Sequence, residues 1–342
     1  MVYKLLIMRN FVATIIGFAL LSILFVGCKK DEPTPKFMIQ AIATEGGTID
    51  GQSGEYEKDE YVVFKAIPSD GYFFDQWSDG STDLEYYITV SEDVTITAQF
   101  QKITITTVDL GLESGTLWAT CNLGANRPWD YGDYYAWGET EPKEKYSSGN
   151  YKFWVDNVDV RWLDSLKLTK YCSNAKYGFD GFTDSLTTLQ PNDDAATAVW
   201  GTEYSTPTLD DWTELVTQCY LVYTSDYNNH KGIIIYKAKS DSDKGAKGPK
   251  NSVIDNPSSD YSLSDPHIFL PFAGWKSSVD GNMAINSECS GRYWSASRRN
   301  LPHQAYDFSF DDYYSPKACY MDVRGYDEYR HQGFPIRPVK HK

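Results

Sequence analysis

Residues 291–339 have the sequence GRYWSASRRNLPHQAYDFSFDDYYSPKACYMDVRGYDEYRHQGFPIRPV. Apolar segments at Tyr293–Ser297 and Phe334–Val339 bracket this stretch. Between them, apolar and polar residues alternate over Ala305–Phe310 and over Ala318–Val323, and this period of two predicts two half-buried strands. Trp294, Phe308, Phe310 and Ile336 are then expected to be framework residues. The stretch therefore predicts a rigid β framework that carries three connecting segments.

The connecting segments, Arg298–His303, Asp311–Lys317 and Arg324–Gln332, are rich in Tyr, Arg, Asp, Ser, Gly and His. Tyr and Arg offer large contact area and directional hydrogen bonds, which is the chemistry of recognition loops on a rigid scaffold. A solvated, Tyr-rich β-meander has the same composition. The predicted ligand contacts are Arg298, Arg299, Asn300, His303, Asp311, Asp312, Tyr313, Tyr314, Tyr320, Arg324, Tyr326, Asp327, Tyr329, Arg330 and His331. Replacing Tyr314 and Arg330 by Ala is expected to abolish binding with little change in melting temperature.

The whole chain has 342 residues, enough for two domains and a substantial core. Its net charge of −15 leaves no basic face of the kind that nucleic acids need, so no nucleic-acid partner is expected. Aromatic residues make up 15%, more than an ordinary core needs, which indicates that some are exposed for binding.

The N-terminal 28 residues have the pattern of an export signal. Lys4 and Arg9 precede the apolar stretch Phe11–Val26, which at 16 residues is short for a transmembrane anchor. Phe25-Val26-Gly27-Cys28 resembles a bacterial lipobox and predicts lipidation of Cys28, which would attach the chain to a membrane. Residues 29–36 form a linker. Its Lys-Lys-Asp-Glu start resembles the tether of Bacteroidetes lipoproteins on the outer face of the outer membrane, although a plain solvated linker has the same features.

The other five cysteines cannot all pair, and the sequence assigns no disulfide. No pair has the CxxC spacing of a zinc site, so the sequence predicts neither a metal nor another cofactor.

Residues 37–101 predict a small all-β domain. Strands are expected at Met38–Ala43, Tyr61–Ile67, Tyr86–Val90 and Val94–Phe100, separated by glycine turns. The phrases GGTIDGQSGEY, AIPSDGYFFDQWSDG and ITVSEDVTITAQF resemble the divergent InlB B-repeat domain. This resemblance implies a spacer on a surface protein, with Trp77 as a core anchor.

Residues 103–342 predict a second domain with two helices. One covers about Asp193–Trp200, and the other follows Thr208 as N-cap, with Asp211 completing a capping box. Strands are expected at Gly232–Ala238 and Ile268–Trp275, with a long polar loop over Ser240–Asp265.

Several phrases of this segment resemble the Fibrobacter succinogenes major paralogous domain of Bacteroidetes surface lipoproteins. They are DLGLESGTLWATCNLGA, DYGDYYAWGETEPK, DDAATAVWG, STPTLDDWTEL, IFLPFAGW, GRYWSAS and GFPIRPV. That family is similar to the C-type-lectin-like fold of formylglycine-generating enzymes. The resemblance implies an α+β architecture, with two helices flanking short antiparallel sheets, and a head that binds an external protein or glycan ligand.

The C-terminal stretch also resembles the variable protein of a diversity-generating retroelement, in which adenine-directed mutagenesis rewrites the end of the gene. AAY template codons yield residue types that include all of Arg298–His303, whereas Lys317 and Glu328 need other codons. An invariant glycan-binding or structural surface module is the alternative.

A formylglycine-generating enzyme is disfavoured because Cys289 and Cys319 are far apart in sequence, so no enzymatic activity is predicted. Calcium-dependent sugar binding is disfavoured because the carboxylates are scattered.

Overall fold

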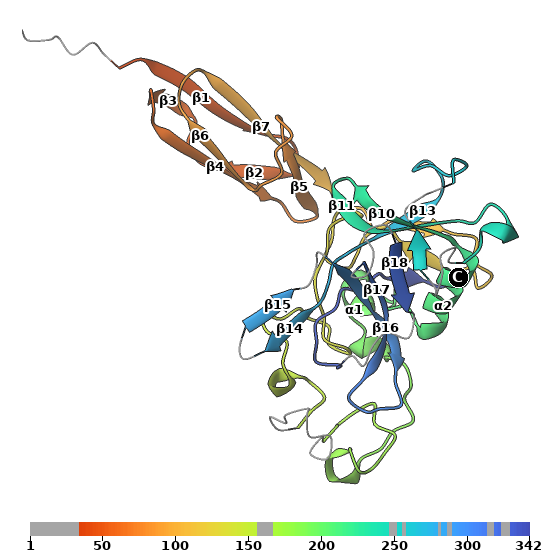
Figure 1. The fold of residues 1–342 in the computed structure, drawn as a ribbon. Coiled ribbons are helices and arrows are strands. Elements are labelled where there is room, and N and C mark those ends of the chain that lie inside the picture. The colour runs from red at the N-terminus through yellow and green to blue at the C-terminus, as the bar shows by residue number, and fades with distance from the viewer. Residues whose placement is uncertain are drawn as a thin grey trace, which may run out of the picture. The chain divides into compact units, whose positions relative to one another are not determined.

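The structure, a computed structural model, describes residues 34–155, 167–245, 252–254, 258–279, 282–285, 289–312, 318–322 and 329–342. The chain divides between Lys102 and Ile103 into two compact units, here called the repeat unit and the head. Figure 1 shows their strands and helices.

The repeat unit consists of two sheets with the strand orders β3-β1-β7-β5 and β2-β4-β6, in which most neighbouring strands are antiparallel. Their bounds are β1 Lys36–Ala43, β2 Gly47–Asp50, β3 Gly54–Glu57, β4 Tyr61–Pro68, β5 Tyr72–Trp77, β6 Glu85–Thr89 and β7 Val94–Lys102. In β4, residues alternate strictly between exposed and buried positions, with Val62, Phe64 and Ala66 inside. The sequence of this strand shows the same period of two. The four expected strands are present as β1, β4, β6 and β7.

Trp77 is the centre of the repeat-unit core. Its side chain is fully buried, and the indole N–H donates to the carbonyl of Asp83 at 2.8 Å. The ring packs against Phe74 and Tyr86 with centroid distances of 5.4 and 5.2 Å. The prediction that Trp77 is a core anchor is therefore confirmed.

The head contains twelve strands and two α-helices among its described residues. The strands are β8 Thr107–Asp109, β9 Leu117–Ala119, β10 Tyr220–Tyr227, β11 His230–Tyr236, β12 Ser252–Ile254, β13 His267–Pro271, β14 Lys276–Val279, β15 Asn282–Ile285, β16 Ser290–Arg298, β17 Ala305–Asp311, β18 Ala318–Asp322 and β19 Val339–Lys340. They form the sheets β10-β11-β13, β12-β18-β17-β16, β14-β15 and β19-β9-β8. The helices are α1 Ala195–Trp200 and α2 Leu209–Gln218, and short 3-10 turns cover Ser148–Asn150, Phe179–Gly181, Pro191–Asp193 and Asp241–Asp243.

The predicted α+β class is wrong, because the described chain is mostly β. The helices α1 and α2 have only 6 and 10 residues, too few to form a layer of their own. The first helix also begins later than expected, because Asp194 is its N-cap and accepts hydrogen bonds from the backbone of Ala196 and Thr197.

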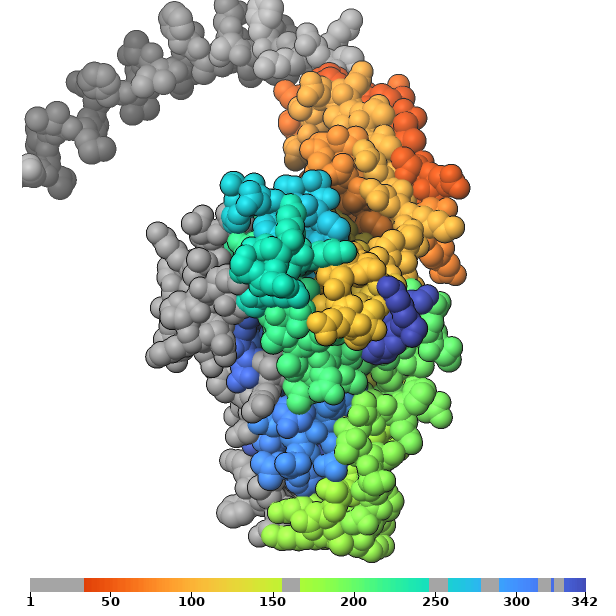
Figure 2. Space-filling view, turned by 90° about the vertical axis from the view of Figure 1, so that its right-hand side faces the viewer, coloured from red at the N-terminus to blue at the C-terminus, as the bar shows by residue number. Residues whose placement is uncertain are grey.

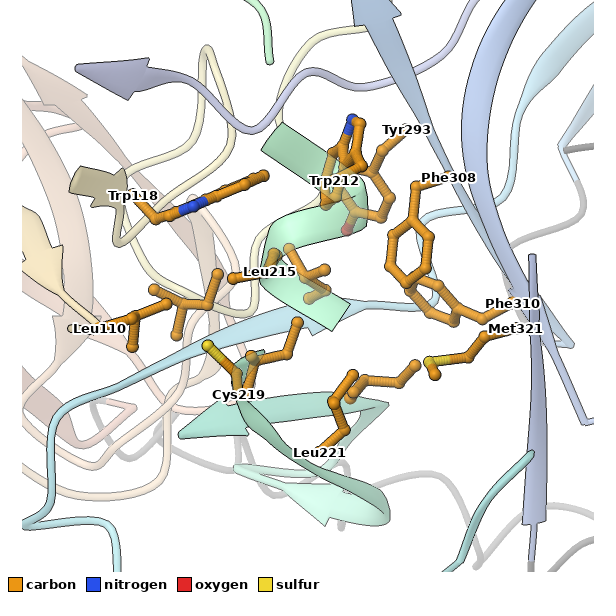
Figure 3. Packing of buried hydrophobic residues seen from close by; sticks show 14 of the residues in the cluster. Leu110, Trp118, Trp212, Leu215, Cys219, Leu221, Tyr293, Phe308, Phe310 and Met321 are labelled. Carbon is orange, nitrogen blue, oxygen red and sulfur yellow. The ribbon is translucent and has the colours of Figure 1, made fainter. Parts of the chain in front are cut away.

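Helix α2 fills the space between the sheets. Thr208 and Asp211 form the expected capping box, with the Asp211 carboxylate accepting from the Thr208 backbone N–H at 2.8 Å. Trp212 stacks between Trp118 and Phe308, with ring centroids 4.7 and 4.8 Å away. Figure 3 shows these rings and Leu215 pointing into one cluster. The head thus has one core around α2 and two further clusters of buried apolar residues beside it.

Strand β17 is buried on both faces, so the prediction of a half-buried strand is wrong for this segment. Phe308 and Phe310 face the core around α2, while Asp307, Ser309 and Asp311 are buried on the opposite face. The four expected framework residues, Trp294, Phe308, Phe310 and Ile336, are all buried, as predicted.

Candidate ligand-binding surface at the hairpin tip

The hairpin formed by β16 and β17 ends in a tight connection, residues 298–304, here called the hairpin tip. Arg298 pairs with Ala305, and the backbone N–H of Gln304 donates to the Leu301 carbonyl at 3.1 Å. These bonds close the turn, so the side chains of Asn300 and Leu301 point outward and are exposed. The end of this hairpin therefore presents one polar side chain, Asn300, and one apolar side chain, Leu301, to solvent.

Two other segments lie beside the hairpin tip. The Arg298 backbone N–H donates to the Thr187 carbonyl at 2.9 Å, and its Nε donates to the Leu186 carbonyl at 2.7 Å. On the other side, Gln304 forms a β-bridge with Tyr329. Figure 2 shows the blue hairpin against the yellow-green atoms of the segment that follows residue 167. Three segments distant in sequence thus meet at one end of the head.

A buried carboxylate anchors the segment that follows residue 167. Asp193 accepts hydrogen bonds from Lys152 Nζ at 2.9 Å, Lys170 Nζ at 2.5 Å and the Tyr171 hydroxyl at 2.7 Å. Desolvation raises the pKa of Asp193, but these donors outweigh it and hold the pKa below its ordinary value. The carboxylate is therefore an ionised, structural cross-link.

Arginine and tyrosine side chains are partly exposed at this end. The Arg299 guanidinium lies 5.3 Å from the ring centre of Tyr306, and both side chains are partly exposed. Tyr329 is also partly exposed. An arginine beside an aromatic ring combines N–H donors with a flat apolar surface, which suits recognition of a carbonyl, carboxylate or hydroxyl.

Arg330 does not belong to this exposed set, which corrects its predicted role as a contact. It is fully buried, with Nε donating to the Gln304 carbonyl at 3.1 Å and both Nη atoms donating to the Tyr171 carbonyl at 3.3 Å. Its guanidinium lies 4.6 Å from the ring centre of Trp137. Burial lowers its pKa to about 10, so it stays charged at neutral pH. Arg330 therefore ties the three segments together from beneath.

His303 and His331 are buried too, and their rings pack against those of Tyr329 and Trp154. Ring centroids are 5.3 Å apart for His303 and Tyr329, 5.6 Å for Tyr329 and His331, and 5.2 Å for His331 and Trp154. Desolvation, followed by the charges of Lys143 and His303, lowers the pKa of His331 to about 4. The two histidines support Tyr329 rather than facing solvent.

The remaining described candidates lie at the other end of β17. This strand has 7 residues, so its ends are about 20 Å apart. Asp311 is buried, and Asp312 accepts from the Tyr223 hydroxyl at 3.0 Å and from Lys231 Nζ at 3.1 Å. Tyr320 lies on β18, where it pairs with Asp311. These residues do not join the hairpin tip in one surface.

Asp307 lies between these two ends and is fully buried. Its two carboxylate oxygens have no hydrogen-bond partner in the part of the chain that the structure describes. Desolvation raises its pKa to about 7, although the charges of Arg292 and Arg299 act to lower it. Asp307 is thus a costly buried acid, and it does not lie on a solvated face of the strand.

Arg337 is a buried charged residue to which the sequence pattern assigned no role. It is fully buried, and its guanidinium donates to Asn122 Oδ1 at 2.8 Å and to the carbonyls of Ala119, Thr120 and Phe269 at 3.1, 2.5 and 2.8 Å. The phrase GFPIRPV, which contains Arg337, is recognisable in the sequence but does not indicate the role of this side chain. Arg337 joins β13 to the β9 region and serves the core.

Several predicted residues lie outside the described residues, namely Cys28, Tyr313, Tyr314, Arg324, Tyr326 and Asp327. Cys121, Cys172, Cys219 and Cys289 are free thiols. Over the described ranges, no group of three or more His, Cys, Asp or Glu side chains is placed to hold a metal ion. Among those same residues, no helix combines the length and apolar character needed to span a membrane.

Comparison with known proteins identifies the first unit only. Residues 37–104 match the family model of the divergent InlB B-repeat domain. No curated protein and no solved structure matches the chain. The repeat unit is therefore of the B-repeat type, and the resemblance of residues 103–342 to the major paralogous domain stays a prediction.

Proposed function

We propose that this chain is a cell-surface binding protein. In this proposal the B-repeat unit is a spacer, and the hairpin tip of the head binds an external protein or glycan ligand. The observation that carries the proposal is the convergence of three segments at one end of the head. There, Arg298, Arg299, Tyr306 and Tyr329 are partly exposed, and Asn300 and Leu301 are exposed.

The framework beneath this surface supports a binding role. Arg330, the buried histidines and Asp193 hold the converging segments, so the backbone at the tip loses little further freedom when a ligand binds. Tyrosine and arginine are the side chains that dominate binding energy at such surfaces. The proposal assigns binding, and no catalysis, to the head.

The test uses the full chain on arrays of glycans and of purified surface proteins. The tip variant combines Arg299→Ala, Asn300→Ala and Leu301→Ala. The matched control combines Val199→Ala, Thr202→Ala and Glu203→Ala, which are exposed positions at the end of α1. We expect the tip variant to lose at least about tenfold in affinity for any ligand found, and the control to bind like the wild type. Equal binding by the two variants would refute the assignment of the tip.

Membrane attachment is the second part of the proposal. The lipobox-like FVGC sequence supports lipidation of Cys28, and the charged tether supports display on the outer face of the outer membrane. Expression in a Bacteroidetes host with a labelled fatty acid should label the wild type and leave Cys28→Ala unlabelled. Protease added to intact cells should then remove the head. Unlabelled wild type, or a head that protease cannot reach, contradicts this part alone.

The retroelement hypothesis concerns whether the ligand is fixed. Sequencing the end of the gene from many cells of one strain tests it. Differences at codons 292–333 that match adenines in a nearby near-identical repeat would establish a diversified receptor. An invariant sequence would leave two alternatives, a binding module with one fixed ligand or a structural surface module.

A further inference from the structure

The outer face of the β2-β4-β6 sheet in the repeat unit carries several large apolar side chains that are exposed. The outward positions of β4 are Tyr61, Val63, Lys65 and Ile67, with relative exposures of 65% for Tyr61, 38% for Val63 and 44% for Ile67. On the neighbouring strand β6, Tyr87 is 54% exposed. Contiguous exposed apolar side chains mark interaction sites more often than scattered ones do.

Two tyrosine rings are the centre of this face. The register places Val63 opposite Tyr87 and Tyr61 opposite Thr89, so Tyr61 and Tyr87 are diagonal neighbours. Their rings are nearly parallel, with an interplanar angle of 21° and centroids 5.8 Å apart. The Tyr87 hydroxyl donates to Glu85 at 2.5 Å, and Glu85 pairs with Lys65 at 3.7 Å. The rings are thus oriented by each other and by a polar row beside them.

The charge on this face argues against an anionic ligand. Its lysine is paired with Glu85, and the nearby outward residue of β2, Asp50, adds a negative charge. The chain as a whole has a net charge of −15, which repels polyanions. A neutral ligand is therefore the electrostatically compatible one.

The size of the face argues against a stable protein partner. The strands β2, β4 and β6 have 4, 8 and 5 residues. Alternate side chains point outward, so the face offers about nine side chains, whereas a standard protein interface uses roughly 20 to 30 on each side. A narrow ligand that stacks on rings needs far less surface. The flat side of a pyranose exposes C–H groups with partial positive charge, which pack against the negative face of an aromatic ring.

We propose that Tyr61 and Tyr87 form a binding platform for a neutral polysaccharide. The sugar rings stack on the tyrosines, and Glu85 and Lys65 hydrogen-bond the hydroxyl groups at the edge. The repeat unit would then hold the protein on a neutral glycan layer independently of the hairpin tip.

Affinity electrophoresis of the purified full chain tests this site, with laminarin, galactomannan or glycogen in the gel and polygalacturonate as the anionic comparison. We expect at least one neutral polysaccharide to retard the wild type and polygalacturonate to have no effect. Tyr61→Ala with Tyr87→Ala should weaken the retardation about tenfold or more, while Tyr61→Phe with Tyr87→Phe should retain most of it, because the rings remain.

Met38→Ala with Ile42→Ala is the matched control. Met38 and Ile42 lie on the other sheet of the same unit, and their side chains are 48% and 44% exposed. Their substitution by alanine removes exposed apolar surface without removing an aromatic ring. The control and the hairpin-tip variant should both be retarded like the wild type, which separates this site from the proposed function of the head. No retardation by any neutral polysaccharide overturns the proposal. So does equal weakening by the control, or sedimentation that shows a dimer dependent on Tyr61 and Tyr87.

Discussion

The hairpin tip and the return segment 329–337 belong to the same C-terminal stretch and have similar side chains, yet their surroundings are opposite. At the tip, Arg299 is partly exposed and lies on Tyr306. In the return segment, Arg330 and Arg337 are fully buried, and each donates to backbone carbonyls. An arginine in this stretch is therefore either a partly exposed side chain or a structural cross-link according to what lies around it, and substitutions should separate the two classes sharply.

The largest expected effect is that of Arg337→Met. The variant leaves three carbonyls and the Asn122 side chain without their donor, and an unsatisfied buried acceptor costs about 1–3 kcal/mol. We expect the head to lose about 4 kcal/mol or more of unfolding free energy. Urea unfolding followed by circular dichroism measures it. Arg299→Met is the matched control and should cost less than about 1 kcal/mol; similar losses in both variants would abolish the distinction between tip and return segment.

Asp307→Asn tests the buried acid between these regions through its pH dependence. The folded-state pKa of about 7 lies above the ordinary value of 3.8, so the folded state binds more protons between these values. The stability contributed by the protonated carboxyl is complete below about pH 4 and is lost as pH rises toward 7. The variant lacks this loss, so its stability relative to the wild type should improve by about 4 kcal/mol from pH 4 to pH 8. A difference that does not change with pH would mean that Asp307 ionises normally.

His331→Phe should change the pH profile in the opposite direction. The folded-state pKa of about 4 lies below the ordinary 6.5, so the unfolded state binds more protons in this window. Wild-type stability therefore falls by about 3 kcal/mol as pH falls from 6.5 to 4, and phenylalanine removes this loss while keeping the rings on Trp154 and Tyr329.

In the wild type the effects of Asp307 and His331 partly offset each other. Thermal unfolding of the two single variants between pH 4 and 8 should therefore give slopes of opposite sign. Parallel slopes would show that one of the two assignments is incorrect.

Local sequence patterns were enough to predict much of the framework. Alternation predicted β4 and β7, and the Thr208 and Asp211 pair predicted the start of α2. Strand β5 was not predicted, because a register shift between Phe74 and Gln76 breaks the alternation on which the prediction depends.

The contacts were harder to predict than the framework, for a physical reason. Composition does not report what covers a residue: β17 alternates like a half-buried strand, but its polar face is buried as well. A buried arginine that donates to carbonyls needs no acidic partner nearby in sequence, so Arg330 looks like a loop residue and Arg337 does not stand out within its apolar segment. The α+β class followed from the resemblance of residues 103–342 to the major paralogous domain, and it is wrong because many short strands surround the two short helices of the described head.

The smallest expected effect is at the hairpin tip itself, where the framework predicts tolerance. Asn300→Ala and Leu301→Ala remove exposed side chains that no core residue needs, so each should change the unfolding free energy by less than about 0.5 kcal/mol. Random substitution at positions 299–301 should therefore yield mostly protease-resistant protein on a display surface. The same library at positions 303, 330 and 331 should yield mostly degraded protein, because those side chains are buried. If both libraries survive equally, the buried side chains at 303, 330 and 331 are not a framework, and the tolerance of positions 299–301 would no longer distinguish the exposed part of the tip.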